Sequence, residues 1–338
     1  MIPAPATHRL HGIEAMRGVA ACAVVLYHVA RHVNQAEPMP ALVRATQWGH
    51  AGVDLFFVLS GFIILHVHAR DLGRPARLGH YLRRRAVRVL PIYWIALGCT
   101  LLMAAFGSHA APTAARIFSS ALLLPASQEP VLGIAWTLQY EMVFYAVFCV
   151  LILNRRLGAA LLALILAWLL TALFVPRVVP AGMPPMFCGA YSLDFYAGLC
   201  VAWWLAHADV PQPRAVAAAG LALLASVGTA ESLGKLNGYG TSARLCYGLA
   251  CAVLILGIVA WERTGGLRVP GWMRRLGAAS YSIYLFQFLC IGAAWLVWQR
   301  ARLPSGLTAW LALSAAAIGG GMLVSMRLEQ PLMRRLRP

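Results

Sequence analysis

Long apolar stretches separated by short polar segments run along the chain from about residue 14 to residue 326. Each stretch covers roughly 17–23 residues, the length that an α-helix needs to cross a bilayer. The pattern therefore predicts an all-α, polytopic membrane helix bundle of about ten transmembrane helices. These are expected near residues 14–32, 51–68, 90–107, 136–153, 157–175, 191–207, 215–230, 243–261, 277–298 and 307–326.

The segments between these stretches leave no room for a separate soluble domain, so residues 1–338 are interpreted as one membrane domain. The apolar stretch 115–124 is too short to span and is expected to be re-entrant or interfacial. Pro91 predicts a break before the third helix, because proline lacks the N–H that a helix interior requires. The first apolar run is followed by further spans, which favours a retained helix over a cleaved signal.

Composition agrees with this interpretation, since 61% of the residues are hydrophobic and 12% are charged. A soluble domain is about half apolar and about a quarter charged. The eight cysteines lie singly, without CxxC pairs or Cys/His ligand spacing, so we expect packed side chains and no metal site. A net charge of +17 suggests nucleic acid only in a soluble protein, and no nucleic-acid partner is expected here.

The positive charge predicts the orientation of the helices, because basic loops remain in the cytoplasm. Placing the N-terminus in the cytoplasm puts 20 of the 28 lysines and arginines, Arg17 included, on the cytoplasmic side. Both termini are then cytoplasmic, and the remaining eight basic residues lie on the outer side.

Two ionisable residues flank the apolar core of the first predicted helix, which reads "IEAMRGVAACAVVLYHVARH". Arg17 and His28 are eleven residues apart, close to three helical turns, so they share one face about 16 Å apart. Charge at membrane depth is costly and indicates function. The pair is interpreted as the wall of a passage, with an ordinary interfacial histidine as the alternative for His28.

Three acidic residues, Asp54, Glu141 and Asp194, fall at a similar outer depth in their predicted helices. A carboxylate beside His28 would orient its ring and stabilise its protonated form. The alternative is a surface position at a helix end, where an acid suits the N-terminus.

The segment between the second and third predicted helices holds seven arginines, more than orientation requires. Arg85 and Arg88 are three residues apart, so on a helix they share a face and are able to fork onto phosphate oxygens. Anchoring to anionic membrane lipid is the alternative.

Six blocks of the chain together resemble the membrane acyltransferase-3 family, in the family's order and over nearly the whole length. They read "MRGVAACAVVLYH", "GVDLFFVLSGFII", "RRRAVRVLPIYW", "WTLQYEMVFY", "SYSIYLFQF" and "RLEQPLMRR". The family's members are integral inner-membrane enzymes that move acyl groups, often acetyl, from cytoplasmic acyl-CoA onto sugars and other acceptors. The short form without a further domain is similar to the exopolysaccharide-modifying branch.

The resemblance implies roles for particular residues of this sequence. Arg17 and His28 are implied to be essential, Arg85 and Arg88 to contact the donor, and Glu141 to be the family glutamate. Gln287 stands where many members have histidine, and an amide cannot titrate. No permanently bound cofactor is expected, since acyl-CoA acts as the donor substrate.

These observations lead to a mechanistic hypothesis. Arginines at the cytoplasmic face, Arg17 included, hold the phosphates of coenzyme A, while His28 removes the proton from a carbohydrate hydroxyl that attacks the thioester. Glu141 or Asp54 would orient the imidazole, and both direct transfer and an acyl-enzyme on His28 stay open. A transporter of an acidic solute or acylated glycan and a structural subunit of a polysaccharide-synthesis complex are the alternative functions.

Overall fold

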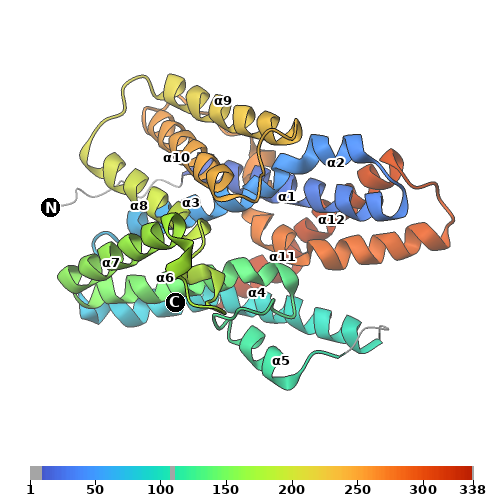
Figure 1. Ribbon diagram of the computed structural model, residues 1–338, viewed down its shortest axis with the longest axis horizontal. Helices are drawn as coiled ribbons and strands as arrows, with labels where there is room; N and C mark the ends of the chain where they lie inside the picture. The colour runs from blue at the N-terminus through green and yellow to red at the C-terminus, as the bar shows by residue number, and fades with distance from the viewer. Residues whose placement is uncertain (1–9, 107–110, 337–338) are drawn as a thin grey trace.

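The computed structural model describes residues 10–106 and 111–336, and these form a bundle of helices (Figure 1). The predicted all-α class is confirmed for this part of the chain. The helices are α1 (His11–Ala36), α2 (Pro40–Thr46), α3 (Gly52–His68), α4 (Leu78–Phe106), α5 (Ala114–Ala121), α6 (Trp136–Leu153), α7 (Arg155–Phe174), α8 (Tyr191–His207), α9 (Pro213–Ser232), α10 (Thr241–Arg263), α11 (Gly271–Arg300), α12 (Leu307–Val324) and α13 (Gln330–Leu336).

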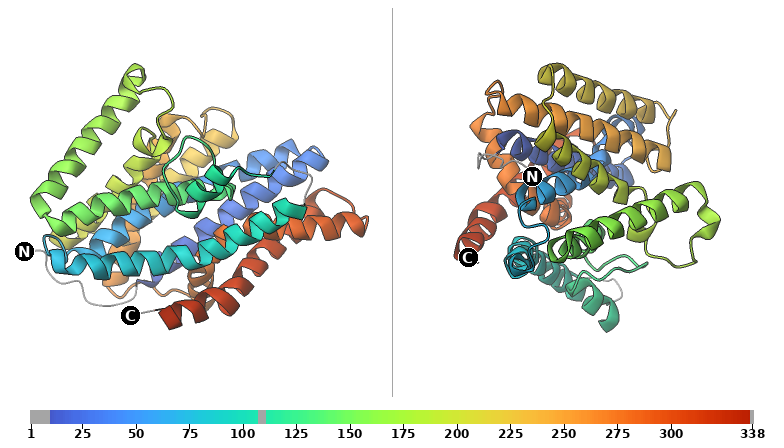
Figure 2. Two further views of the ribbon diagram at one scale, coloured as in Figure 1. Left: turned by 90° about the horizontal axis from the view of Figure 1, so that it is seen from below. Right: turned by 90° about the vertical axis from the view of Figure 1, so that its left-hand side faces the viewer.

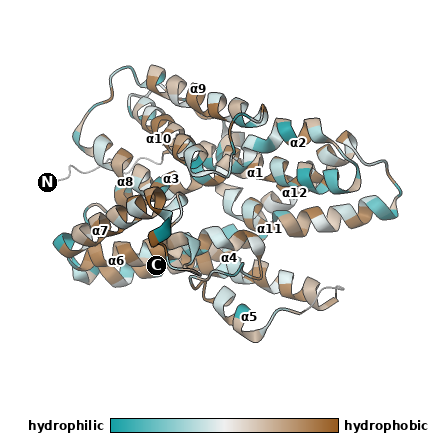
Figure 3. Ribbon diagram, viewed as in Figure 1, coloured by the Kyte–Doolittle hydropathy of each residue, from teal (hydrophilic) through white to brown (hydrophobic). Residues whose placement is uncertain are grey.

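Within the described residues, nine helical segments are long and apolar enough to cross a membrane. The predicted span 191–207 forms α8, whose 17 residues make it slightly shorter than those nine. Apolar residues prevail along the helices in Figure 3, and many of them face outward. An exposed apolar surface of this size suits lipid rather than water, so the prediction of a multi-span membrane bundle is confirmed.

The predicted break at Pro91 is wrong, because Pro91 lies inside α4. Figure 2 shows α4 as one long helix that runs along the bundle. Its 29 residues correspond to about 43 Å, more than the hydrocarbon core requires. Neighbouring helices supply partners for the backbone around a membrane proline. Close to Pro91, the hydroxyl of Tyr281 on α11 donates to the carbonyl of Val89, at 2.8 Å, although the carbonyl that Pro91 itself leaves without an N–H is that of Val87.

The stretch predicted to be too short to span overlaps α5, which has only eight residues. It is held against α4 by two hydrogen bonds to its last carbonyls. The Tyr93 hydroxyl donates to Ser120 O at 2.7 Å, and the Trp94 indole donates to Ala121 O at 2.9 Å. The stretch is therefore an accessory to α4 and not a further span.

Helix α1 is the centre of the bundle and lies against α3, α10, α11 and α12. Its first turn leaves backbone N–H groups without partners in the helix. The Glu262 carboxylate at the end of α10 accepts from His11 N at 2.6 Å and from Gly12 N at 2.8 Å. Further along, Gly18 of α1 approaches the backbone of Gly277 on α11, so this pair of helices packs closely.

Glycine also allows α3 and α8 to pack closely, because Gly61 and Gly198 each face the backbone of the other helix. A side chain on Gly198 would run into the backbone of Val58 and Phe62, and one on Gly61 would run into Phe195. Small residues at such crossings give the close van der Waals contact that holds membrane helices together.

We expect Gly198→Val to destabilise the protein by about 1–3 kcal/mol or more, since the added atoms force α3 and α8 apart. Gly319→Val in α12 is the matched control, because a side chain there meets open space. Thermal unfolding in detergent measures both. Equal melting temperatures for the two variants would contradict the packing described for α3 and α8.

Candidate active site

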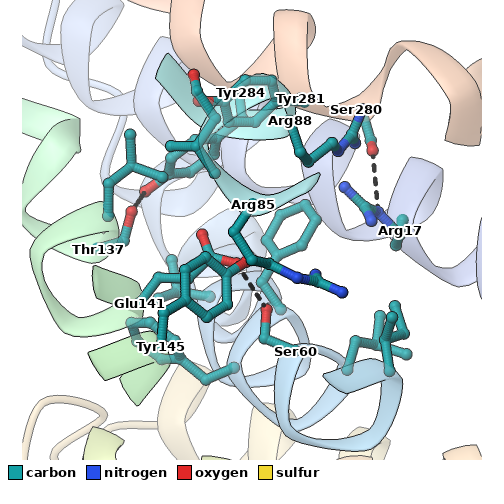
Figure 4. A pocket seen from close by; sticks show the side chains of 17 residues that line it. Arg17, Ser60, Arg85, Arg88, Thr137, Glu141, Tyr145, Ser280, Tyr281 and Tyr284 are labelled. Carbon is teal, nitrogen blue, oxygen red and sulfur yellow. Dashed lines mark hydrogen bonds between the residues drawn. The ribbon is translucent and has the colours of Figure 1, made fainter. Parts of the chain in front are cut away.

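Two adjoining cavities penetrate the bundle from the end where α1 and α11 begin. The wider one, here called the vestibule, has a volume of about 640 Å³. The narrower one, here called the tunnel, has a volume of about 100 Å³ and continues inward between α1, α3, α4, α6 and α11 (Figure 4). Arg17 and Arg88 line both cavities and therefore stand at the junction.

Basic side chains dominate the vestibule. Two carboxylates, from Glu14 and Glu329, lie among them. The arginines that line it are Arg17, Arg88, Arg274, Arg275 and Arg334. The start of α1, the start of α11 and the last helix meet around this space, so the two ends of the described chain lie on the same side of the bundle.

Arg88 is fixed by a buried carboxylate from the far end of the sequence. Its Nη1 donates to Glu329 Oε1 at 2.9 Å, and its guanidinium lies 5.4 Å from the centre of the Tyr281 ring. Glu329 is 2% exposed and also accepts from Ser282 at 2.7 Å and Ser325 at 3.0 Å. Glu329 ends a π-helical turn, Ser325–Glu329, a local geometry that is frequent at functional sites.

Arg85 faces the tunnel from the same helix as Arg88. It donates to His68 Nε2 at 3.0 Å, and His68 Nδ1 is 2.8 Å from Asp71 Oδ2. A carboxylate only accepts, so this arrangement assigns the His68 proton to Nδ1 and leaves Nε2 free to accept from Arg85. The Arg85 guanidinium also lies 5.4 Å from the centre of the Tyr145 ring.

Glu141 is the carboxylate of the tunnel wall. Ser60 donates to it at 3.3 Å, and the Tyr145 hydroxyl donates to the same oxygen. Arg17, on the opposite side, is held by Ser280 at 3.4 Å. The tunnel thus offers donors and an acceptor along one narrow path.

Aromatic residues close the inner end of the tunnel. Tyr284 and Thr137 bond through their hydroxyls at 3.2 Å, and the Tyr284 ring packs edge-on against Phe56 with centres 5.7 Å apart. All three residues line the tunnel.

His28 lies beyond this closed end and lines neither cavity. Its ring packs edge-on against Tyr27 and Phe288, with ring centres 4.9 Å and 4.8 Å apart. Phe288 follows Tyr284 by four residues on α11, which places His28 about one helical turn past the tunnel end. Arg17 therefore lines both cavities while His28 lines neither, so a continuous path between the two residues stays a prediction.

The structure does not bring the predicted carboxylates to His28. Glu141 faces the tunnel, and Asp54 forms a buried ion pair with Arg244 at 2.6 Å. The Arg244 guanidinium lies 4.6 Å from the centre of the Tyr191 ring. Asp54 and Asp194 are 0% and 3% exposed, so a surface position is wrong for both.

Gln287 is fully buried in α11 and lines neither cavity. Its Nε2 donates to the Tyr284 carbonyl at 3.0 Å, while Oε1 has no hydrogen-bond partner. Its amide therefore contacts the backbone of its own helix, and the structure does not bring Gln287 to the predicted binding site.

Several lining residues were not identified from the sequence, although their spacing carried a signal. Thr137 and Tyr145 stand four residues before and after the predicted Glu141 in "WTLQYEMVFY", so they share its helix face. Ser60 lies in "GVDLFFVLSGF" and Glu329 in "RLEQPLMRR", both inside the quoted blocks. Across residues 10–106 and 111–336, no group of three or more His, Cys, Asp or Glu side chains is placed to hold a metal ion.

Comparisons with known proteins agree with this arrangement. The family model described as an acyltransferase domain matches residues 10–326. The chain is 33% identical over 307 residues to the exopolysaccharide production protein ExoZ of Rhizobium meliloti (strain 1021), covering 86% of this chain and 91% of that protein. It is 27% identical over 377 residues to the acyltransferase MdmB of Streptomyces mycarofaciens, covering 98% of this chain and 94% of the relative.

A third relative matches only a part of the chain. This is protein 2 in the picA locus of Rhizobium radiobacter, 36% identical over 95 residues, which cover 28% of this chain and 44% of that protein. No solved structure matches. The family model spans nearly all of the helices described above, and the ExoZ relative aligns over most of both chains. The chain therefore belongs to the acyltransferase domain family and is a multi-pass membrane acyltransferase.

Proposed function

We propose that this acyltransferase moves an acyl group, taken to be acetyl, from cytoplasmic acyl-CoA to a hydroxyl of a cell-surface carbohydrate or its lipid-linked precursor in the bacterial inner membrane. The observation that carries the proposal is the vestibule, which is rich in arginine and adjoins, at Arg17 and Arg88, a tunnel between α1, α3, α4, α6 and α11. The carbohydrate acceptor is supported by the name of the ExoZ relative, an exopolysaccharide production protein.

The vestibule suits the nucleotide end of coenzyme A. Coenzyme A carries several phosphates, and guanidinium groups bind phosphate oxygens in pairs of parallel hydrogen bonds. Glu329 holds Arg88 in place, while Arg274, Arg275 and Arg334 line the walls. A large cavity with this many cations has room for a nucleotide and favours an anionic one.

The tunnel suits the narrow pantetheine arm, whose two amides both donate and accept. The Glu141 carboxylate accepts an amide N–H, and Arg85 donates to an amide carbonyl. This assigns Glu141 and Arg85 to the donor arm, whereas phosphate binding is assigned to Arg88 and the vestibule. The thioester then reaches the level of His28 when Tyr284 turns away from Phe56.

At His28 the acceptor hydroxyl loses its proton to the neutral imidazole as its oxygen attacks the thioester carbonyl carbon. The carbon–sulfur bond breaks, and the leaving thiolate of coenzyme A takes the proton from the imidazolium. The route transfers the acyl group directly, and the base is regenerated within each turnover.

We expect His28→Ala to reduce acyl transfer by about 10²–10⁴-fold, because it removes the general base. Binding of acyl-CoA should persist, since the vestibule lies at the other end of α1. Calorimetry in detergent measures acyl-CoA affinity, and the mass of the host's surface glycans measures transfer.

His32→Ala is the matched control, because His32 lies one turn further along α1, against Trp295, and lines neither cavity. It should retain transfer. A His28→Ala protein that adds acyl groups at a near-normal rate would show that His28 is not the base.

Arg88→Ala and Arg85→Ala should each raise the KM for acyl-CoA more than they lower kcat, because contacts remote from the reacting bond mainly supply uniform binding. The loss of a charged hydrogen bond corresponds to a rise of roughly tenfold or more. Arg84→Ala, an exposed neighbour on the same helix, should change neither constant. If the KM for acyl-CoA is unaltered in both variants at normal protein levels, these arginines do not bind acyl-CoA.

Topology provides an independent check, because the proposal requires a cytoplasmic vestibule. Reporter fusions at loops on the vestibule side should indicate the cytoplasm, and those at the opposite loops the outer side, as the basic residues predict. The first set follows residues 72, 155, 211 and 268, and the second follows residues 40, 180, 236 and 302. Two or more reversed reporters would contradict the proposed entry route for coenzyme A.

A further inference from the structure

A second polar cluster lies at the opposite end of α1 from the vestibule, and the mechanism above does not use it. We call it the Tyr239 cluster. It brings together side chains from α1, from the 3₁₀ turn η1 (Gln47–Ala51), from α9, from α10 and from the loop 233–240. Its members are Tyr27, Arg31, His50, Glu231, Tyr239 and Tyr247.

At its base, a buried carboxylate orients a buried imidazole. His50 Nε2 is 2.7 Å from Glu231 Oε1, and the Tyr247 hydroxyl donates to Glu231 Oε2 at 2.5 Å. Since a carboxylate only accepts, the pairing assigns the proton to Nε2 and leaves Nδ1 as an acceptor. The His50 side chain is 6% exposed, and its Nδ1 has no hydrogen-bond partner. An acceptor nitrogen with nothing to accept from indicates a missing donor.

One aromatic ring stacks on this imidazole, and the rings of Tyr27 and Tyr247 meet it edge-on. Tyr239 stacks on His50 with ring centres 4.9 Å apart and an angle of 26° between the rings, yet Tyr239 remains 52% exposed. Its hydroxyl bonds to the Tyr27 hydroxyl and accepts from Arg31 at 2.8 Å. The neighbouring Gly238 lies so close to the Glu231 carboxylate that no side chain fits there, which holds the loop over the pair.

The cluster is adjacent to the proposed base. The ring of Tyr27 contacts His28 on one side, with centres 4.9 Å apart, and His50 on another, with centres 5.7 Å apart. A molecule bound at the Tyr239 cluster would therefore lie next to His28, at the end of the path opposite to the vestibule.

We propose that the Tyr239 cluster is the subsite that binds a sugar ring of the acceptor and presents its neighbouring hydroxyl to His28. This inference rests on the proposed function. Sugar hydroxyls both donate and accept, so they match Arg31 and Tyr27 as donors and His50 Nδ1 as an acceptor. When they replace the Tyr239 hydroxyl on Tyr27 and Arg31, Tyr239 turns outward and its ring lies along the apolar face of the sugar.

A purely structural cluster would not require these features. Joining α1, α9 and α10 needs satisfied hydrogen bonds, whereas this cluster keeps one acceptor free under a ring that is half exposed. The mixture of an aromatic face, a cation, phenol hydroxyls and a free acceptor favours an uncharged polyhydroxylated ligand over a simple anion.

The test measures acceptor and donor kinetics separately in purified protein. The acceptor is a preparation of oligosaccharides released from the host's own surface polysaccharide after alkaline removal of its ester groups. Tyr239→Ala and His50→Gln should each raise the KM for this acceptor roughly tenfold, as expected for one lost contact of about 1.4 kcal/mol. Acyl-CoA affinity, measured by calorimetry, should stay within about twofold of the wild-type value, because Tyr239 is remote from the vestibule.

Two further variants exclude a general loss of structure. Tyr239→Phe keeps the ring and should retain most of the acceptor affinity. Trp272→Ala removes a comparably exposed aromatic residue, 63% exposed at the start of α11, and should leave both KM values unchanged. An unchanged acceptor KM in both Tyr239→Ala and His50→Gln, with normal melting temperatures, would overturn the subsite alone. A wild-type protein that transfers no acyl group to any carbohydrate would overturn the proposed function.

Discussion

The pairing of guanidinium groups inside a membrane protein is the constraint on which the rest of this structure depends. A charged side chain at membrane depth costs about 2.5–3.5 kcal/mol on insertion scales, so each arginine needs a partner where it stands. Arg88 has Glu329, Arg244 has Asp54, and Arg85 has His68 backed by Asp71. Because Arg88 and Glu329 are 241 residues apart, one ion pair fixes α4 against the end of the chain.

The paired arginines are of two kinds, which differ in whether the guanidinium group also faces a cavity. Arg244 is buried with Asp54 and is surrounded by aromatic rings, so its charge stabilises a junction of α3 and α10. Arg88 is partly exposed, with one side on Glu329 and the other open to both cavities. An arginine that keeps donors free toward a cavity is available to an anion, whereas Arg244 is buried and lines neither cavity.

The sequence allowed the spans to be predicted because apolar length reports directly on the bilayer. Arg17, Arg85 and Arg88 were predicted to lie together at one face of the bundle, and all three line the tunnel. Glu141 lines it too, although it was predicted beside His28. The ion-pair partners of the buried charged residues could not be predicted from the sequence in this way. Nothing in the local pattern pairs Asp54 with Arg244, 190 residues away, because such contacts depend on which helices meet.

Two further differences have local causes. Pro91 was expected to end a helix, but a membrane helix keeps its course when neighbours supply hydrogen bonds. Glu141 and Asp54 were expected beside His28 because the sequence suggested a similar depth for all three, yet it does not show which helices meet or which way each side chain faces. In the structure Glu141 faces the tunnel and Asp54 faces Arg244.

The small size of the tunnel has a consequence for the cell's energy supply. A path that carries an acyl group across a membrane, as the proposed function requires, would also risk becoming a leak for ions and protons and draining the membrane potential. The vestibule is wide, but the tunnel holds only about 100 Å³ and ends at Tyr284 and Phe56. Arg17 and Arg88 at its entrance repel cations, much as a fixed positive charge does in a selective pore. In the proposed route, a narrow tunnel lined by arginine would keep the membrane insulating between turnovers.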